Sequence, residues 1–110
     1  MIIPATVVKD GYTFKVTEVA AKAFQNNKKL TTLVLGVNVS KIGAKSFYKN
    51  TKLKSITFKN KNAVKIGSQA FKGIKATAKV NVPKKMTAKN FNKLKKAMKS
   101  AGKKIKYRKK

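Results

Sequence analysis

The chain has 110 residues, which is enough for one domain but too few for two lobes that enclose a catalytic cleft. Lysine and arginine total 29 against two acidic residues, so the formal net charge is +27 and the favoured partners are anionic. The absence of histidine and cysteine excludes the usual zinc and thiolate sites, a Ser/His/Asp triad and a catalytic cysteine.

The two carboxylates, Asp10 and Glu18, are too few to cleave a sugar and also bind it, or to surround a divalent cation. We therefore expect a non-enzymatic protein with no catalytic, cofactor-binding or metal site. No window approaches the roughly 18 apolar residues of a membrane span, and the start Met1-Ile2-Ile3-Pro4 lacks the regions of a signal peptide. Either the protein is intracellular, or a signal was removed ahead of this sequence.

The first predicted element is a β-hairpin within residues 1–16. Residues 6–9 and 12–16 flank Asp10-Gly11, a dipeptide favoured in two-residue hairpin turns because both central positions need positive φ. We expect this hairpin to cap the N-terminal end of the repeats that follow it.

The repeats are marked by Phe24, Phe47 and Phe71, which recur at spacings of 23 and 24 residues. We divide them into units 17–38, 39–63 and 64–83. Stacking the units would line one interior with ladders of matching side chains, because neither a single strand nor a turn buries a core alone. Other matched apolar positions are Val19, Ile42 and Ile66; Leu33, Ile56 and Val80; and Leu35, Phe58 and Val82.

Each unit is expected to contribute one short strand and one turn. Residues 33–35, 56–58 and 80–82 show the alternation of a strand with one buried face. The segments before them place a large apolar residue after small ones, which favours a tight helical turn at 20–26, 43–49 and 67–72.

The repeat pattern resembles a known family. Leu30-x-x-Leu33-x-Leu35-x-x-Asn38 is similar to the strand segment of leucine-rich repeats, and Val39-x-x-Ile42-Gly43-x-x-x-Phe47 resembles the continuation in BspA-like bacterial proteins, with repeats of about 23 residues. The second unit has one inserted residue, and Lys61 and Lys85 occupy the asparagine position. The resemblance covers roughly residues 16–82 and implies a solenoid with a short parallel sheet. It also implies the C-terminal repeat segment of a secreted or cell-surface protein.

The last predicted elements lie in the basic segment 84–110. Thr87 is a suitable N-cap for a helix from Ala88 to Ala101, which Gly102 would end, and Pro83 ends the strand before it. We expect the helix to cap the last repeat with an apolar face formed by Phe91, Leu94, Ala97, Met98 and Ala101.

A short strand is predicted at residues 104–107, with Lys109 and Lys110 frayed beyond it. The predicted fold class is therefore α+β: a leucine-rich-repeat solenoid with an N-terminal hairpin cap and a C-terminal helical cap, in a single domain spanning residues 1–110.

Two sets of residues are candidates for binding. Side chains that alternate with the buried strand positions form the face that leucine-rich repeats commonly use for partners. The resemblance and this geometry assign it to Thr32, Val34, Ser55, Thr57, Lys59, Lys79 and Asn81.

The basic tail is the second candidate, for polyanions. It holds 12 lysines and one arginine without an acidic residue, and such runs neutralise phosphates or sulfates with release of counterions. A solvated capping helix explains the same lysines. The tail residues proposed for polyanion binding are Lys84, Lys85, Lys89, Lys93, Lys96, Lys99, Lys103, Lys104 and Arg108.

The sequence thus favours a non-enzymatic, adhesion-type interaction module on a bacterial surface, with a protein, an acidic glycan or a cell-wall polymer as partner. Two alternatives stand beside it: a nonspecific nucleic-acid or other polyanion binder, and a cationic membrane-active protein. The count of 28 lysines to one arginine argues against base-specific recognition, which favours the guanidinium group. A cytoplasmic location fits the sequence less well, and the oligomeric state does not follow from it.

Overall fold

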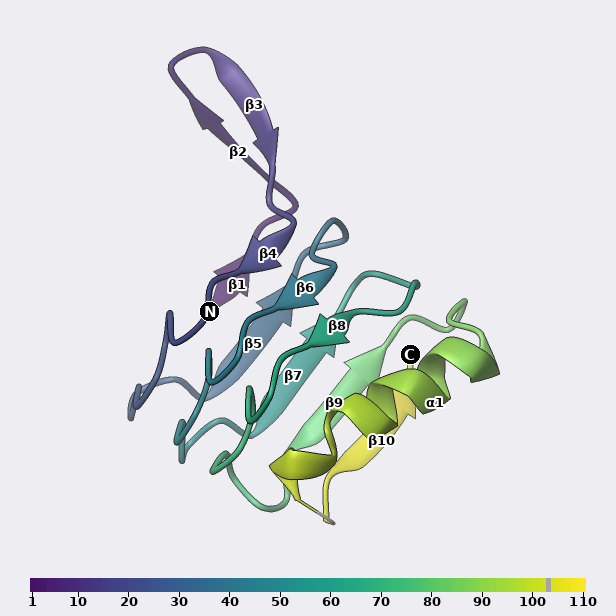
Figure 1. Ribbon diagram of the computed structural model, residues 1–110. Coiled ribbons are helices and arrows are strands. Elements are labelled where there is room, and N and C mark those ends of the chain that lie inside the picture. The colour runs from purple at the N-terminus through teal and green to yellow at the C-terminus, as the bar shows by residue number, and fades with distance from the viewer. Residues whose placement is uncertain (103) are drawn as a thin grey trace.

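The computed structural model describes residues 1–102 and 104–110, which form parallel sheets, one hairpin and one α-helix (Figure 1). Five parallel strands make up the main sheet. In spatial order they are β1 (Ile2–Ile3), β5 (Thr32–Leu35), β7 (Ser55–Phe58), β9 (Lys79–Val82) and β10 (Lys106–Lys109).

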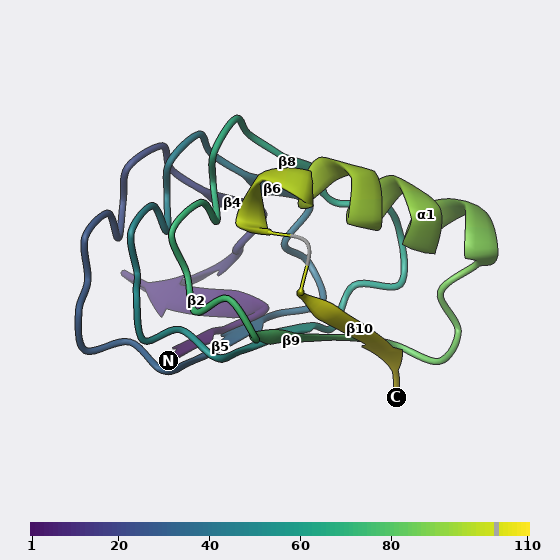
Figure 2. The same cartoon turned by 90° about the horizontal axis from the view of Figure 1, so that it is seen from below.

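A second sheet of three short parallel strands faces the main sheet across the core (Figure 2). The sequence predicts only one strand per unit, so these strands are an addition. Their positions Val19, Ile42 and Ile66 were recognised as matched apolar residues, but a strand of two residues is too short to show alternation. The strands are β4 (Glu18–Val19), β6 (Lys41–Ile42) and β8 (Lys65–Ile66).

The register of the main sheet confirms the repeat alignment. Leu33 pairs with Ile56, and Ile56 pairs with Val80, as the phenylalanine spacing predicts. All three side chains are fully buried. Because side chains alternate along a strand, this register turns one whole set of residues into the core and the other set outward.

The phenylalanines stack on one another inside the core. The ring centroids of Phe24 and Phe47 are 5.4 Å apart, and those of Phe47 and Phe71 are 5.2 Å apart, with nearly parallel planes. Phe47 and Phe71 are buried, whereas Phe24 in the first unit is partly exposed. The predicted ladder is confirmed.

The turns that carry the phenylalanines are not helical, contrary to the prediction. Lys22, Lys45 and Gln69 have positive φ of 60°, 56° and 57°, which no right-handed helical turn contains. The turn amides bond sideways instead: the Phe24 N–H donates to the Ser46 carbonyl at 2.8 Å. The next unit therefore supplies the acceptors that an isolated helical turn would have to supply itself.

The hairpin is formed by β2 (Thr6–Lys9) and β3 (Tyr12–Lys15), with the predicted positive φ at Asp10 and Gly11. It projects away from the stacked units instead of lying across the first of them (Figure 1). The strand at the N-terminal edge of the main sheet is β1. The Val16 N–H donates to the Ala5 carbonyl at 2.8 Å and closes the base of the hairpin, and the Asn38 Nδ2 of the first unit donates to the same carbonyl at 3.0 Å.

The C-terminal helix α1 spans Ala88–Ala97 and is shorter than predicted. Its predicted N-cap is confirmed, because the Thr87 hydroxyl accepts from the Asn90 N–H at 3.2 Å. The chain continues as a 3₁₀-helix over Lys99–Ala101, a common tightening at helix ends. Leu94 and Met98 of the predicted apolar face are buried.

The final strand lies two residues later than predicted. Lys109 belongs to β10, and the Lys110 N–H donates to the Val82 carbonyl at 2.8 Å, so the expected fraying of these residues is wrong. Pairing with the exposed edge of β9 explains the order, because β9 offers a full row of backbone partners.

Candidate binding surface

The outward face of the main sheet changes character from β1 to β10. The paired positions Ile2, Val34, Thr57, Asn81 and Arg108 form one row across the five strands. The row runs from apolar through polar to cationic. The positions Thr32, Ser55, Lys79 and Lys106 form a second row, which runs from polar to cationic.

Most of the residues predicted to face a partner are accessible. Thr32, Lys59 and Lys79 are exposed, while Val34, Ser55 and Thr57 are half-buried. The predicted Asn81 is only 6% exposed and forms part of the floor. The Asn81 Nδ2 donates to the Thr57 Oγ1 at 3.4 Å, and its Oδ1 has no hydrogen-bond partner among the described residues. The sequence did not place Lys106 or Arg108 on this face, because the predicted C-terminal strand was not assigned to this sheet; Arg108 was a candidate only for polyanion binding.

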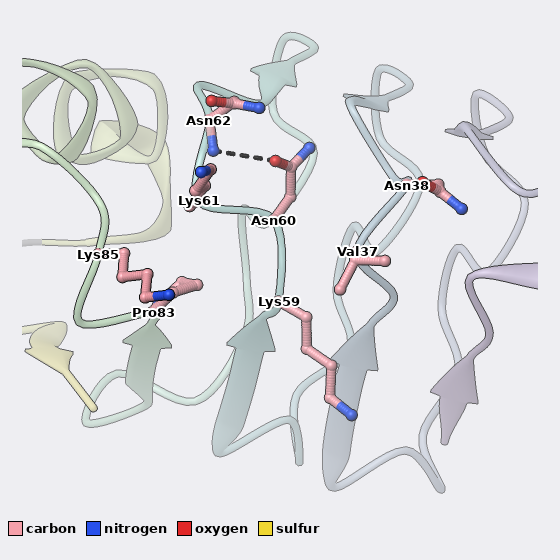
Figure 3. Close-up of a pocket in the computed structure, with 8 residues that line it drawn as sticks. All are labelled: Val37, Asn38, Lys59, Asn60, Lys61, Asn62, Pro83 and Lys85. Atoms are coloured by element: carbon pink, nitrogen blue, oxygen red, sulfur yellow. Dashed lines mark hydrogen bonds between the residues drawn. The ribbon is translucent and has the colours of Figure 1, made fainter.

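A hollow of about 350 Å³ lies beyond the C-terminal ends of β5, β7 and β9 (Figure 3). A second hollow of about 340 Å³ shares three of its lining residues and reaches the outward face of the sheet at Thr57 and Asn81. We call the first hollow the strand-end groove. Its lining residues are Val37, Asn38, Lys59, Asn60, Lys61, Asn62, Pro83 and Lys85.

Asparagines fix the backbone of the groove. The Asn38 Nδ2 donates to the Ala5 carbonyl at 3.0 Å, and the Asn60 Nδ2 donates to the Val39 carbonyl at 3.1 Å. The first bond ties the loop after β5 to the segment between β1 and β2, and the second ties the loop after β7 to the loop after β5. The Asn60 Oδ1 also accepts from the Asn62 N–H at 2.9 Å, which closes the loop after β7 (Figure 3).

Asn60 therefore does in the second unit what Asn38 does in the first. The sequence alignment placed Lys61 at this position and missed the asparagine. Asn38 lies 14 residues after Phe24, whereas Asn60 lies 13 residues after Phe47, so counting from the phenylalanine gives Lys61. The available signal was the pair of asparagines, Asn60 and Asn62, on either side of Lys61.

The electrostatics of the groove come from lysine alone. Lys59, Lys61 and Lys85 line it without an acidic neighbour, and Figure 3 shows their ammonium groups spread along its length. The chain's Glu18 lies elsewhere, 4.0 Å from the Lys41 ammonium, and both side chains are more than half exposed. The groove thus offers several separate cations to a ligand with repeated negative groups.

The predicted polyanion residues do not gather in one patch. Lys85 lies in the groove, Arg108 on the outward sheet row, and Lys96 and Lys99 around a separate hollow beside Gln69. All of the predicted tail residues are exposed except Lys103, which lies outside the described residues.

Lys95, which the sequence did not single out, contributes to packing. Its ammonium lies 4.2 Å from the centroid of the Phe91 ring and 5.8 Å from that of Tyr107. The two rings meet edge to face at 6.4 Å. Burial raises the pKa of the Tyr107 hydroxyl above its usual value. This cluster joins α1 to β10 and is better suited to stability than to binding.

Stacked parallel strands with a matched apolar interior are typical of leucine-rich-repeat proteins. The chain belongs to the BspA-type family, because the family model described as "BspA type Leucine rich repeat region (6 copies)" matches residues 12–100. A search of curated protein sequences gave no significant match.

The crystal structure of a leucine rich cell surface protein from Faecalibacterium prausnitzii is similar to this chain, with 26% identity and a TM-score of 0.58. The match covers 78% of this chain and 30% of that protein, so the chain spans less than a third of its length. Within the described residues, no helix combines the length and the apolar character needed to cross a membrane.

Proposed function

We propose that this chain is a non-enzymatic interaction module of a bacterial cell-surface or secreted protein, with an adhesion-type role. Its partner is an anionic polymer or an acidic protein that lies across the strand-end groove and the adjoining sheet face. The observation that carries the proposal is the row of Lys59, Lys61 and Lys85 along a groove with no acidic lining residue.

The groove depends on a solenoid in which consecutive units keep one register. The sideways backbone bonds and the stacked phenylalanines support this arrangement. We further propose that α1 caps the last unit, because Leu94 and Met98 are buried while the helix lysines are exposed. Because α1 covers the end of the core, the residues of the groove are not needed for that role and stay accessible to a ligand.

Shape distinguishes this groove from the rest of the basic surface. The loops that present Lys59 and Lys61 are held by the Asn60 side chain, so these charges start from a fixed backbone. A preorganised site loses less conformational entropy on binding than flexible tail lysines do. Lysines without such support attract any polyanion by charge alone, and salt screens that attraction.

The test compares two variants that remove equal charge. The first replaces Lys59, Lys61 and Lys85 with alanine, and the control replaces the exposed Lys29, Lys52 and Lys72. Binding to heparin, poly-glutamate and a teichoic acid is measured by titration calorimetry across a salt series. We expect at least a tenfold loss for one of these ligands in the groove variant, and a smaller loss in the control.

Equal losses in the two variants would overturn the proposal and favour the nonspecific polyanion binder, particularly if duplex DNA gave the same result. The membrane alternative is tested with anionic vesicles. The burial of Leu94 and Met98 leaves α1 little apolar surface for a bilayer, so we expect vesicles to bind no better than soluble polyanions of similar charge.

A further inference from the structure

A second group of lysines lies at the start of the strands, opposite the strand-end groove. Lys54, Lys75 and Lys79 surround a hollow of about 370 Å³, and Ser55 and Thr77 complete its lining. The three lysines are exposed, and no acidic residue lines the hollow. We call these lysines the strand-start cluster. The main sheet thus carries cationic groups at both ends of its strands.

Strand β7 connects the strand-start cluster to the groove. Its residues Ser55 and Thr57 and the following Lys59 face outward, because they alternate with buried positions. The step of five residues from Lys54 to Lys59 spans about 17 Å at the rise of an extended strand. Figure 3 shows the Lys59 side chain extending back beside the strands. A ligand that follows β7 therefore meets cations at both ends of its path.

The floor between the two groups of lysines is neutral and polar. Ser55 and Thr57 are half-buried, and Asn81 of β9, which pairs with Thr57, forms the floor beside them. The Asn81 Oδ1 has no hydrogen-bond partner among the described residues. Hydroxyl groups both donate and accept, so a ligand that carries hydroxyls matches these side chains. None of the three is an aromatic residue, a methionine or an arginine, which are the residues that commonly anchor a protein partner.

We propose that β7 and β9 form a binding track for an acidic glycan, which runs along the strands from the strand-start cluster to the strand-end groove. The acidic groups of the glycan contact the lysines at the two ends, and its hydroxyl groups contact the floor between them. The track does not continue onto β5, where the uncharged Thr31 stands at the position of Lys54. This inference rests on the function proposed above, and it specifies the class of ligand and the direction in which the ligand lies.

Ligand length gives the proposal a distinctive signature. When one chain reaches both groups of lysines, the second contact becomes intramolecular and raises the affinity steeply. A galacturonate dimer is too short to cover about 17 Å, whereas an octamer covers it with units to spare. Attraction by total charge alone raises the affinity gradually with length, and it depends little on which lysines are present.

The first experiment titrates the full chain with the galacturonate dimer and with the octamer, at a salt concentration where both bind measurably. The test variant replaces Lys54, Lys75 and Lys79 with alanine, and the control is the variant of three exposed lysines already used for the groove. We expect the test variant to lose at least tenfold in affinity for the octamer and less than threefold for the dimer. The control should lose less than threefold for both ligands. Circular dichroism verifies that each variant is folded.

The second experiment tests the floor, with a galacturonate octamer and a glutamate octamer as ligands. Both carry one carboxylate per unit, but only the glycan carries hydroxyl groups. The test variant is Thr57→Val, and the control is Thr32→Val on the same face of β5. We expect Thr57→Val to lose at least threefold in affinity for the galacturonate octamer and nothing for the glutamate octamer. Thr32→Val should leave both affinities unchanged.

Equal losses for the dimer and the octamer would overturn the track, and so would an octamer loss no larger than that of the control. An effect of Thr57→Val that is the same for the two octamers would overturn the assignment of a glycan. Each of these results is separate from the case for the groove. That case fails only when the loss of Lys59, Lys61 and Lys85 weakens binding no more than its control does.

Discussion

The interior of the repeats and the lysine-rich surface differ in how closely their side chains are matched between units. Inside, each position is matched between units, so that Phe47 lies between Phe24 and Phe71 with both ring separations under 5.5 Å. On the surface, the paired positions Glu18, Lys41 and Lys65 carry both signs of charge, and two lysines stand side by side at Lys41 and Lys65. Interior contacts thus depend on shape, whereas most surface lysines contribute only to total charge. Substitutions should affect stability in the first region and binding in the second.

Replacing Phe47 with alanine should have the largest effect on stability. Its ring is fully buried and stacks on two others, so the substitution leaves a cavity that the rigid units on each side cannot close. We expect a loss of about 4 kcal/mol in the free energy of unfolding. Urea is the suitable denaturant for this measurement, because guanidinium salt would screen the charge repulsion at the same time.

Phe24→Ala is the matched control, because Phe24 is only partly buried and stacks on one ring. The loss in the free energy of unfolding should be about half that of Phe47→Ala, because the Phe24 ring buries less apolar surface on folding. Equal costs would mean that the end of the stack is as well covered as its middle, which would contradict the comparison of end and interior units.

Gly43→Ala should have the second largest effect. A Cβ atom at Gly43 would lie 2.4 Å from the Ala21 nitrogen and 2.7 Å from its Cα, and neither backbone atom can move aside. We expect a loss of about 3 kcal/mol. Gly11→Ala in the hairpin meets nothing within 4 Å, so its cost of about 1 kcal/mol should come from positive φ alone. A smaller loss for Gly43 than for Gly11 would show that the units can separate easily.

Sequence patterns were sufficient for features that repeat or that follow from turn chemistry. The three phenylalanines were found because several apolar columns share their spacing, and Asp10-Gly11 identified the hairpin from its backbone requirement alone. The outward face of the sheet follows from alternation once the strands are known. Whether that face binds a partner stays a prediction.

Other features could not be predicted from the sequence, because they depend on contacts between units. The strands of the second sheet exist only through pairing with their neighbours, and the groove is assembled from loops that follow three different strands. Asn60 follows its phenylalanine one residue sooner than Asn38 does, so an alignment that counts residues missed it. The sequence predicted that Lys110 frays, whereas Val82 of β9 supplies an acceptor for its N–H. Tertiary contacts thus override local propensity at each of these points.

Ser46→Ala should increase stability. Ser46 is fully buried, and its hydroxyl has no hydrogen-bond partner among the described residues. Ala23 and Ala70 occupy the same position in the neighbouring units, so alanine fits there without rearrangement. Removing the unpaired hydroxyl should raise the free energy of unfolding by about 1 kcal/mol. A lower stability in urea would indicate that the serine is partnered in solution.

Tyr107→Phe should have the smallest effect, and only at high pH. Burial raises the pKa of the folded-state hydroxyl, so the folded protein keeps this proton after the unfolded chain has lost it. The group's contribution to stability is therefore complete below about pH 10, the usual tyrosine pKa, and is lost as the pH rises above that value. Deprotonation of lysines changes stability in both proteins alike and cancels in the difference. Wild type should lose stability relative to Tyr107→Phe as the pH rises above about 10. Parallel urea midpoints there would mean that the hydroxyl is as accessible in the folded protein as in the unfolded chain.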